Sequence, residues 1–217
     1  MTRILRTWRE AGGTLALRER DGRLDLVLGN VVLLSSAALE TELGFGELAA
    51  QSFGEGQGAP RVLVGGLGFG STLRGVLRVL PADGRVIVVE KLEAVIELAH
   101  AEAAHLFEGA LEDPRVELVR DDVADVIARE SGLAAILLDV DNGPEWASFR
   151  TNARLYADAA LVRTRTALRE RGLFSVWSGY AVDPFVARLR KAGFVARIVP
   201  LTERGVVRAR AYVGVAP

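Results

Sequence analysis

From residue 61 onward, short apolar runs alternate with segments of helical pattern. Continuous apolar runs of this length are typical of strands in a parallel sheet that helices cover on both faces. Right-handed crossovers between such strands produce a doubly wound α/β fold. The predicted strands cover residues 61–65, 85–89, 115–119, 134–138, 173–177, 195–199 and 206–213, and the predicted helices cover 71–80, 92–107, 150–169 and 184–192, with a short one after Asp122.

The chain before residue 58 has a different pattern. Segments at 14–18, 24–28 and 31–34 are separated by the turn-forming pairs Asp21-Gly22 and Gly29-Asn30, which predicts a small antiparallel sheet of about three strands. So small a sheet should pack on the rest of the chain or on a partner. A helix is expected over 37–50, and the glycine-rich stretch 54–60 predicts a linker. We therefore expect a β-hairpin region with its connecting helix over 1–57 and a Rossmann-like domain over 58–217.

Composition and charge exclude several functions. The 217 residues include 27 basic and 28 acidic side chains, and the net charge of -1 argues against broad contact with nucleic acid. Cysteine is absent, which excludes disulfides and zinc–thiolate sites, and two histidines are too few for a multi-histidine metal site. No apolar run reaches the roughly 20 residues that span a bilayer. The N-terminal segment lacks the apolar core of a signal peptide, so we expect a cytoplasmic protein without a membrane partner.

A glycine-rich turn follows the first apolar strand of the larger domain. It contains Gly66, Gly68 and Gly70, with a predicted helix directly behind it. Glycine permits a tight turn and lets a ligand lie against the backbone, while the helix N-terminus offers free N–H groups. The spacing is G-x-G-x-G and not the G-x-G-x-x-G of dinucleotide-binding proteins, which favours a ligand of the S-adenosylmethionine type. A turn needed only for close packing is the alternative.

Carboxylates follow the next three predicted strands. Glu90 ends the second strand, where an acidic side chain can bind both ribose hydroxyls. Asp122 follows the third strand and is able either to receive the amino group of adenine or to cap the next helix. Asp139 and Asp141 follow the fourth strand, where they can bind a cation or take a proton from an amine. Two neighbouring negative charges raise the pKa of one of them, which suits a base, although Asp141 could instead stabilise an Asp-Asn-Gly turn.

These signals, in this order, resemble the spermidine synthase family, which has the class I S-adenosylmethionine-dependent transferase fold. In this resemblance Glu90 matches the acidic residue that holds the ribose, and Asp122 matches the aspartate that meets adenine. Asp139 matches the aspartate regarded as catalytic, which deprotonates or orients the attacking amine. Lys91 and Val123, which follow the ribose and adenine residues, are assigned to the same cofactor site.

The resemblance extends to the N-terminal stretches Leu17-Arg-Glu-Arg-Asp-Gly and Val32-Leu-Leu-Ser-Ser, which are similar to the family's N-terminal hairpin region. It implies transfer of an aminopropyl group from decarboxylated S-adenosylmethionine to a polyamine, with release of methylthioadenosine. It also implies a homodimer, a small amine as the acceptor, and no metal.

The sequence departs from the family pattern where the donor chain and the polyamine bind. Phe69 stands where the family has a loop aspartate that contacts the donor's amino group. Asp141 follows Asp139 by two positions where the family's second acid follows by three. Glu42 occupies the place of a polyamine-binding glutamate, without the neighbouring tyrosine and histidine. Glu42 and Asp141 remain the predicted acceptor-binding residues in an altered pocket. A small-molecule methyltransferase, which Phe69 favours slightly, and a non-catalytic adenosine-binding dimer module are the alternatives.

Overall fold

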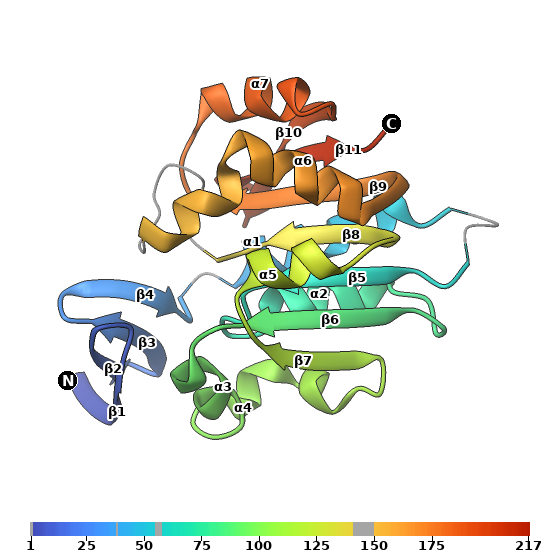
Figure 1. Cartoon of the computed structure of the whole chain (residues 1–217). Helices are drawn as coiled ribbons and strands as arrows, with labels where there is room; N and C mark the ends of the chain where they lie inside the picture. Colours follow the sequence, from blue (N-terminus) through green and yellow to red (C-terminus); the bar gives the residue numbers. More distant parts are fainter. Residues whose placement is uncertain (1, 38, 55–57, 141–149) are drawn as a thin grey trace.

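A computed structural model describes residues 2–37, 39–54, 58–140 and 150–217. It contains a seven-stranded sheet with helices on both faces and a separate four-stranded sheet at the N-terminus (Figure 1). The predicted α/β class, with its small N-terminal antiparallel region, is therefore confirmed. No helix in these four ranges is long and apolar enough to cross a membrane.

The order of the large sheet is β10-β11-β9-β8-β5-β6-β7. From β7 to β9 all neighbours are parallel, whereas β11 runs antiparallel between β9 and β10. The expectation of a wholly parallel sheet is wrong for β11, because Arg204 and Gly205 both adopt positive φ and join β10 to β11 in a tight hairpin. The strands are β5 (Arg61–Gly65), β6 (Arg85–Glu90), β7 (Val116–Arg120), β8 (Leu133–Leu138), β9 (Leu168–Ser178), β10 (Val195–Glu203) and β11 (Val206–Val215).

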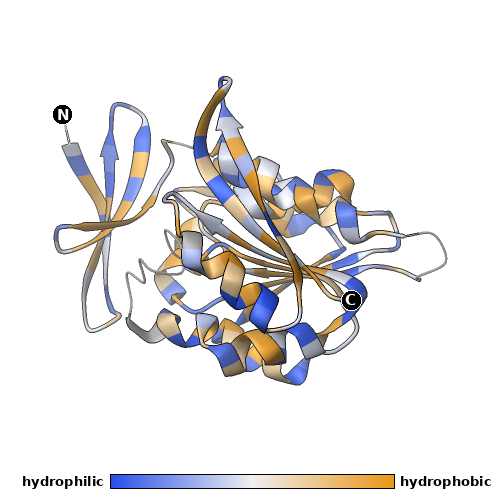
Figure 2. Cartoon of the chain, turned by 90° about the horizontal axis from the view of Figure 1, so that it is seen from above, coloured by the Kyte–Doolittle hydropathy of each residue, from blue (hydrophilic) through white to orange (hydrophobic). Residues whose placement is uncertain are grey.

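Both faces of the large sheet are buried in apolar side chains. Along β5, Val62 and Val64 join the core on the face covered by α1, α2 and α3, and Leu63 joins the core beneath α5, α6 and α7. Apolar residues are accordingly frequent along the strands of the large sheet, whereas the helices carry both apolar and polar residues (Figure 2). The helices are α1 (Glu40–Glu47), η1 (Leu48–Ser52), α2 (Ser71–Val79), α3 (Glu93–Ala99), α4 (Ala104–Phe107), η2 (Ala110–Glu112), α5 (Val123–Arg129), η3 (Arg150–Tyr156), α6 (Asp158–Ala167) and α7 (Asp183–Lys191).

Three predicted helices are shorter than expected. The helix predicted over 92–107 divides into α3 and α4, because the N–H of Ala103 bonds back to the carbonyl of Leu98 at 2.8 Å and turns the chain. The helix predicted over 150–169 divides at Ala157, whose backbone is extended, and ends where β9 begins. The helix predicted over 37–50 begins at Glu40 and continues as the 3-10 helix η1.

The N-terminal sheet has four strands where about three were expected. Its order is β1-β2-β3-β4, formed by β1 (Thr2–Glu10), β2 (Gly13–Arg20), β3 (Arg23–Leu28) and β4 (Val31–Ser35). The sheet docks on the larger domain through β1 and α3. The carboxylate of Glu10 accepts the N–H groups of Glu93 at 2.9 Å and Ala94 at 3.0 Å, and Trp8 donates to Glu97 at 3.0 Å.

Candidate active site

The glycine loop lies directly against the backbone that follows β8. Gly66 has a φ of 90°, and a Cβ atom there would lie 2.4 Å from the carbonyl oxygen of Asp139. Gly70 begins α2 with a φ of 81°, and a Cβ there would lie 2.4 Å from Cδ1 of Phe107. A side chain at either position would push these segments apart. The loop therefore brings Asp139 next to the N-terminus of α2.

A cavity of about 700 Å³ opens above this loop, between the carboxyl ends of the parallel strands and strand β4 of the N-terminal sheet. In Figure 1 the ends of β6 and β8 point toward that sheet. Gly70 does not line the cavity, and Asp141 lies outside the described residues. The predicted residues that line it are Glu42, Gly66, Gly68, Glu90, Lys91, Asp122, Val123 and Asp139.

Glu90 is a buried carboxylate that connects the end of β6 to the glycine loop. Its Oε2 accepts the N–H of Leu67 at 3.0 Å, and its Oε1 accepts the N–H groups of Lys91 at 2.7 Å and Leu92 at 2.8 Å. Burial raises the pKa of Glu90, and the three backbone donors lower it by less. Because a carboxylate oxygen has two lone pairs, Oε2 keeps one for a ligand.

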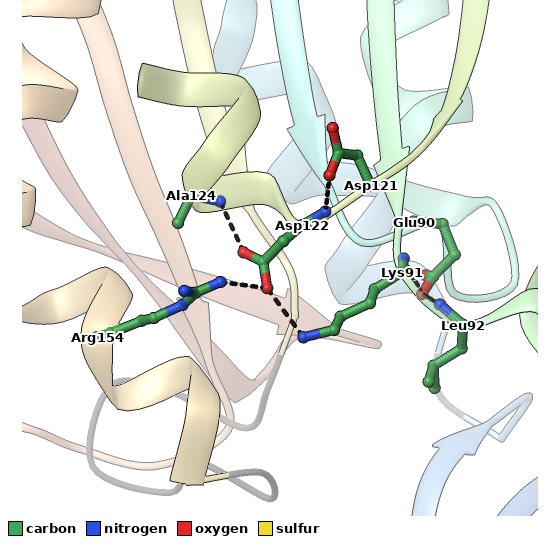
Figure 3. Close-up of polar contacts among 7 residues, drawn as sticks. All are labelled: Glu90, Lys91, Leu92, Asp121, Asp122, Ala124 and Arg154. Carbon is green, nitrogen blue, oxygen red and sulfur yellow. Dashed lines mark hydrogen bonds and ion pairs between the residues drawn. The ribbon is translucent and has the colours of Figure 1, made fainter. Parts of the chain in front are cut away.

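Asp122 is bonded on both of its oxygens (Figure 3). Oδ1 accepts the N–H of Ala124 at 3.0 Å, so Asp122 is the N-cap of α5. Oδ2 forms ion pairs with Lys91 at 3.0 Å and with Arg154 at 2.5 Å. Burial alone would raise the pKa of Asp122, but these hydrogen bonds and charges outweigh it and hold the pKa below its usual value. The capping role predicted as one of two possibilities is thus present, and the adenine contact stays a prediction.

Asp139 and Glu42 form a pair of carboxyl groups at the cavity wall. Oδ2 of Asp139 accepts a hydrogen bond from the hydroxyl of Thr72 at 2.6 Å. Burial raises the pKa of Asp139 to about 6, although the Thr72 hydrogen bond lowers it. Burial and the charge of Asp139 raise the pKa of Glu42 well above its usual value. Two carboxyl groups that resist joint ionisation near neutral pH suit proton transfer and the binding of a cation.

Several residues of this site were not predicted from the sequence. Thr72 and Arg154 contact the predicted carboxylates, while Asn152 lines the cavity. Strands β3 and β4 add an apolar wall that includes Leu26, Val32, Leu33 and Leu34. No motif marks these residues, because their roles depend on how the helices and the N-terminal sheet pack.

Fold and site together define a class of protein. The large sheet has a parallel core, one antiparallel strand beside the edge of that core, and a glycine loop at the end of β5. This is a Rossmann-like sheet of the methyltransferase type.

No family model matches the chain. It is 29% identical over 124 residues to the polyamine aminopropyltransferase of Synechococcus sp. (strain JA-2-3B'a(2-13)), a match over 55% of this chain and 37% of that protein. It is 30% identical over 124 residues to the polyamine aminopropyltransferase of Aeropyrum pernix, over 54% of this chain and 37% of that protein. The match thus spans little more than a third of the length of these curated relatives.

The fold comparison covers more of the chain. A crystal structure of spermidine synthase in complex with the transition state analogue AdoDATO aligns with 99% of this chain and 73% of its own, with a TM-score of 0.75 at 18% identity. Identity this low establishes the fold alone. The predicted resemblance to the spermidine synthases is confirmed, in sequence over part of the chain and in fold over nearly all of it.

Proposed function

We propose that this chain binds decarboxylated S-adenosylmethionine in the cavity and transfers the aminopropyl group to a small amine. The observation that carries the proposal is the charge of the cavity. Its described lining residues include one basic side chain, Lys91, and six carboxyl-bearing side chains: Glu10, Glu42, Glu90, Asp121, Asp122 and Asp139. A donor with a sulfonium and an ammonium group but no carboxylate suits this surface better than intact S-adenosylmethionine or an anionic dinucleotide.

The adenosine part of the donor would occupy the end of the cavity near β6 and α5. The free lone pair of Glu90 Oε2 would accept a ribose hydroxyl, above the backbone of Gly66 and Gly68. Asp122 Oδ1, which accepts one N–H from the protein, would accept the amino group of adenine. The N–H of Val123 would donate to a ring nitrogen, since the first residue of a helix has no intrahelical acceptor.

Asp139 would act as the base in the transfer step. The acceptor ammonium gives a proton to Asp139, and the neutral nitrogen then attacks the aminopropyl carbon attached to sulfur. The C–N bond forms as the C–S bond breaks, and the electron pair of that bond passes to sulfur. Neutral methylthioadenosine leaves, and the positive charge moves to the nitrogen of the product. Glu42 would bind the cationic acceptor next to this base. Asp141 stays a proposed acceptor ligand on sequence grounds alone.

The comparisons support this proposal. Both curated relatives are named polyamine aminopropyltransferases, and the aligned crystal structure is a spermidine synthase that holds a transition state analogue. Phe69 is the observation that favours methyl transfer as the second candidate. It is 3% exposed and lines the cavity, and it adds no carboxylate to the loop.

The test is a calorimetric titration with decarboxylated S-adenosylmethionine, S-adenosylmethionine, methylthioadenosine and NAD, followed by mass spectrometry of mixtures with small diamines and monoamines. We expect the decarboxylated donor to bind more tightly than the intact one and to yield an aminopropylated amine. Tighter binding of the intact donor, with a methylated product, would favour methyl transfer. Binding of adenosine ligands without any product would favour the non-catalytic module.

We also propose that the chain forms a homodimer through its N-terminal sheet. Strands β1 and β4 are the edges of that sheet, and they carry Ile4, Val31 and Val32, which are 60%, 51% and 48% exposed. Open edges with apolar side chains favour pairing with another chain. Light scattering of the wild type and of a Val31→Lys variant tests this: we expect a dimer that the lysine weakens, and a monomeric wild type would refute it.

A further inference from the structure

The hydroxyl of Thr72 lies between the two carboxyl-bearing residues of the cavity wall. Thr72 is the second residue of α2 and is 3% exposed. Its Oγ1 lies 2.6 Å from Oδ2 of Asp139 and 3.4 Å from the backbone carbonyl oxygen of Glu42. The contact with Asp139 is the shorter by far, and it joins residues 67 positions apart in the chain.

The packing of α1 on α2 fixes this hydroxyl in place. A Cβ at Gly46 of α1 would lie 2.2 Å from the carbonyl oxygen of Thr72, and a Cβ at Gly75 of α2 would lie 2.1 Å from that of Leu43. The two backbones are therefore in direct contact on either side of Thr72. The backbone N–H of Asp139 donates to the carbonyl oxygen of Gly65 at 2.8 Å, which fixes the backbone at Asp139. Both residues of the Thr72–Asp139 hydrogen bond are therefore held in place by backbone contacts.

We propose that Thr72 is a positioning residue, whose hydroxyl holds Oδ2 of Asp139 and so presents Oδ1 to the acceptor amine. The inference rests on the proposed function, because it assigns the amine proton to Asp139. Thr72 donates one hydrogen bond throughout and exchanges no proton. The hydrogen bond fixes Oδ2 of Asp139 and thereby restricts rotation of the carboxylate about its Cβ–Cγ bond, so that Oδ1 keeps one orientation.

The hydroxyl also sets how readily Asp139 takes up a proton. The ionisable group that faces Asp139 within the described residues is Glu42, on α1. Burial raises the pKa of Asp139 to about 6, and the hydrogen bond from Thr72 opposes that rise. A variant without the hydroxyl should therefore have a higher pKa at Asp139, so that less of the base is ionised at neutral pH.

Three variants separate this role from a purely structural one. Thr72→Val keeps the shape and removes the hydroxyl, and Thr72→Ser keeps the hydroxyl. Thr164→Val is the matched control, because Thr164 is 2% exposed and lies on α6, away from the cavity. The first readout is a carbon-13 NMR titration of the aspartate carboxyl groups, with the signal of Asp139 assigned by its loss in Asp139→Asn. The second is kcat for aminopropyl transfer as a function of pH.

We expect Thr72→Val to shift the titration of Asp139 upward by roughly one pH unit, through loss of a hydrogen bond to a charged group. Its kcat at pH 7 should fall about tenfold or more, while the KM for the donor changes less than about threefold. Thr72→Ser and Thr164→Val should stay within about threefold of the wild type in kcat. If Thr72→Val does not fold, Thr72→Ala is measured in the same way.

The proposal is overturned if Asp139 titrates in the hydroxyl-free variant as it does in the wild type. It is equally overturned if Thr72→Ser loses as much activity as Thr72→Val. The NMR titration needs no turnover, so it decides the role of Thr72 toward Asp139 even for a chain that transfers nothing. If the wild type transfers aminopropyl groups but Thr72→Val leaves the titration of Asp139 unshifted, only the role of Thr72 is contradicted. If the titration shifts but the wild type transfers nothing, only the proposed function is contradicted.

Discussion

The ammonium of Lys91 lies 3.0 Å from Oδ2 of Asp122, so the residue after the predicted ribose ligand is bonded to the predicted adenine ligand. Arg154 approaches the same oxygen from η3 (Figure 3). Oδ2 therefore accepts from two cations, whereas Oδ1 caps α5 and, in the proposed function, accepts the amino group of adenine. This division of the carboxylate makes its two roles separable by mutation.

Asp122→Asn should weaken adenosine binding with little effect on stability. Asparagine is as good an N-cap as aspartate, so its oxygen can still accept the N–H of Ala124. Its amide nitrogen would take the place of Oδ2 and face Lys91 and Arg154, donor against donor, and its neutral oxygen is a weaker acceptor for the amino group of adenine than a carboxylate oxygen. We expect the affinity for methylthioadenosine to fall about tenfold, roughly 1.4 kcal/mol, by calorimetry.

Asp122→Ala is the control for the capping role. It should lower the free energy of unfolding by about 0.5–2 kcal/mol in urea, because α5 loses its cap. Unchanged methylthioadenosine affinity in Asp122→Asn would show that adenine binds elsewhere.

Glu10 should determine how firmly the N-terminal sheet docks on the larger domain. Each of its carboxylate oxygens accepts one N–H at the start of α3, from Glu93 and from Ala94. Glu10→Ala removes both acceptors and should cost about 1 kcal/mol of stability. We expect faster hydrogen exchange in β1 and weaker donor binding, since Glu10 also lines the cavity. Exchange in β1 that matches the wild type would refute this role. Glu19→Ala, on β2, is the surface control, because its partner is the exposed Arg3.

The pH dependence of stability should reveal the buried acid at position 139. The folded pKa of Asp139 is about 6, above its usual value of 3.8, so the folded state binds more protons than the unfolded state between these values. Stability from this group is therefore present at low pH and is lost as pH rises from about 4 through about 6. Relative to Asp139→Asn, the wild type should lose about 1–3 kcal/mol between pH 4 and pH 7 in urea titrations. A constant difference across that range would contradict the raised pKa.

Much of the fold was predictable because the buried strands of the large sheet are continuous apolar runs. β1 was not predicted, since its arginines at positions 3, 6 and 9 interrupt any apolar alternation. That strand depends on pairing with β2 and on the contacts of Trp8 and Glu10 with α3, which are distant in sequence. The strand predicted over 206–213 is present as β11, but its antiparallel direction was not predicted, because a run of apolar residues does not indicate strand direction.

The candidate site likewise contains residues that the sequence predicts and residues that it does not. Glu90, Asp122 and Asp139 were predicted because each follows a parallel strand, and the carboxyl ends of such strands meet at one edge. Thr72 and Arg154 contact those carboxylates through the packing of α2 and η3, which local sequence does not encode.

Glu42 should contribute to acceptor binding, while the ionisation of Asp139 sets the acid limb of kcat. Burial and the charge of Asp139 raise the pKa of Glu42 well above its usual value, so Glu42 is still neutral when Asp139 ionises. Glu42→Gln replaces a neutral carboxyl group by a neutral amide of the same size, so the acid limb of kcat should not move. A bound cation favours the ionised form of Glu42, which the variant lacks, so the KM for the acceptor should rise about tenfold, while the KM for the donor changes little. Glu40→Gln, on the same helix and outside the cavity lining, is the matched control and should leave the profile unchanged. A Glu42→Gln enzyme with an unaltered acceptor KM would show that Glu42 does not bind the acceptor, and an acid limb that moves would show that Glu42 is charged when Asp139 ionises.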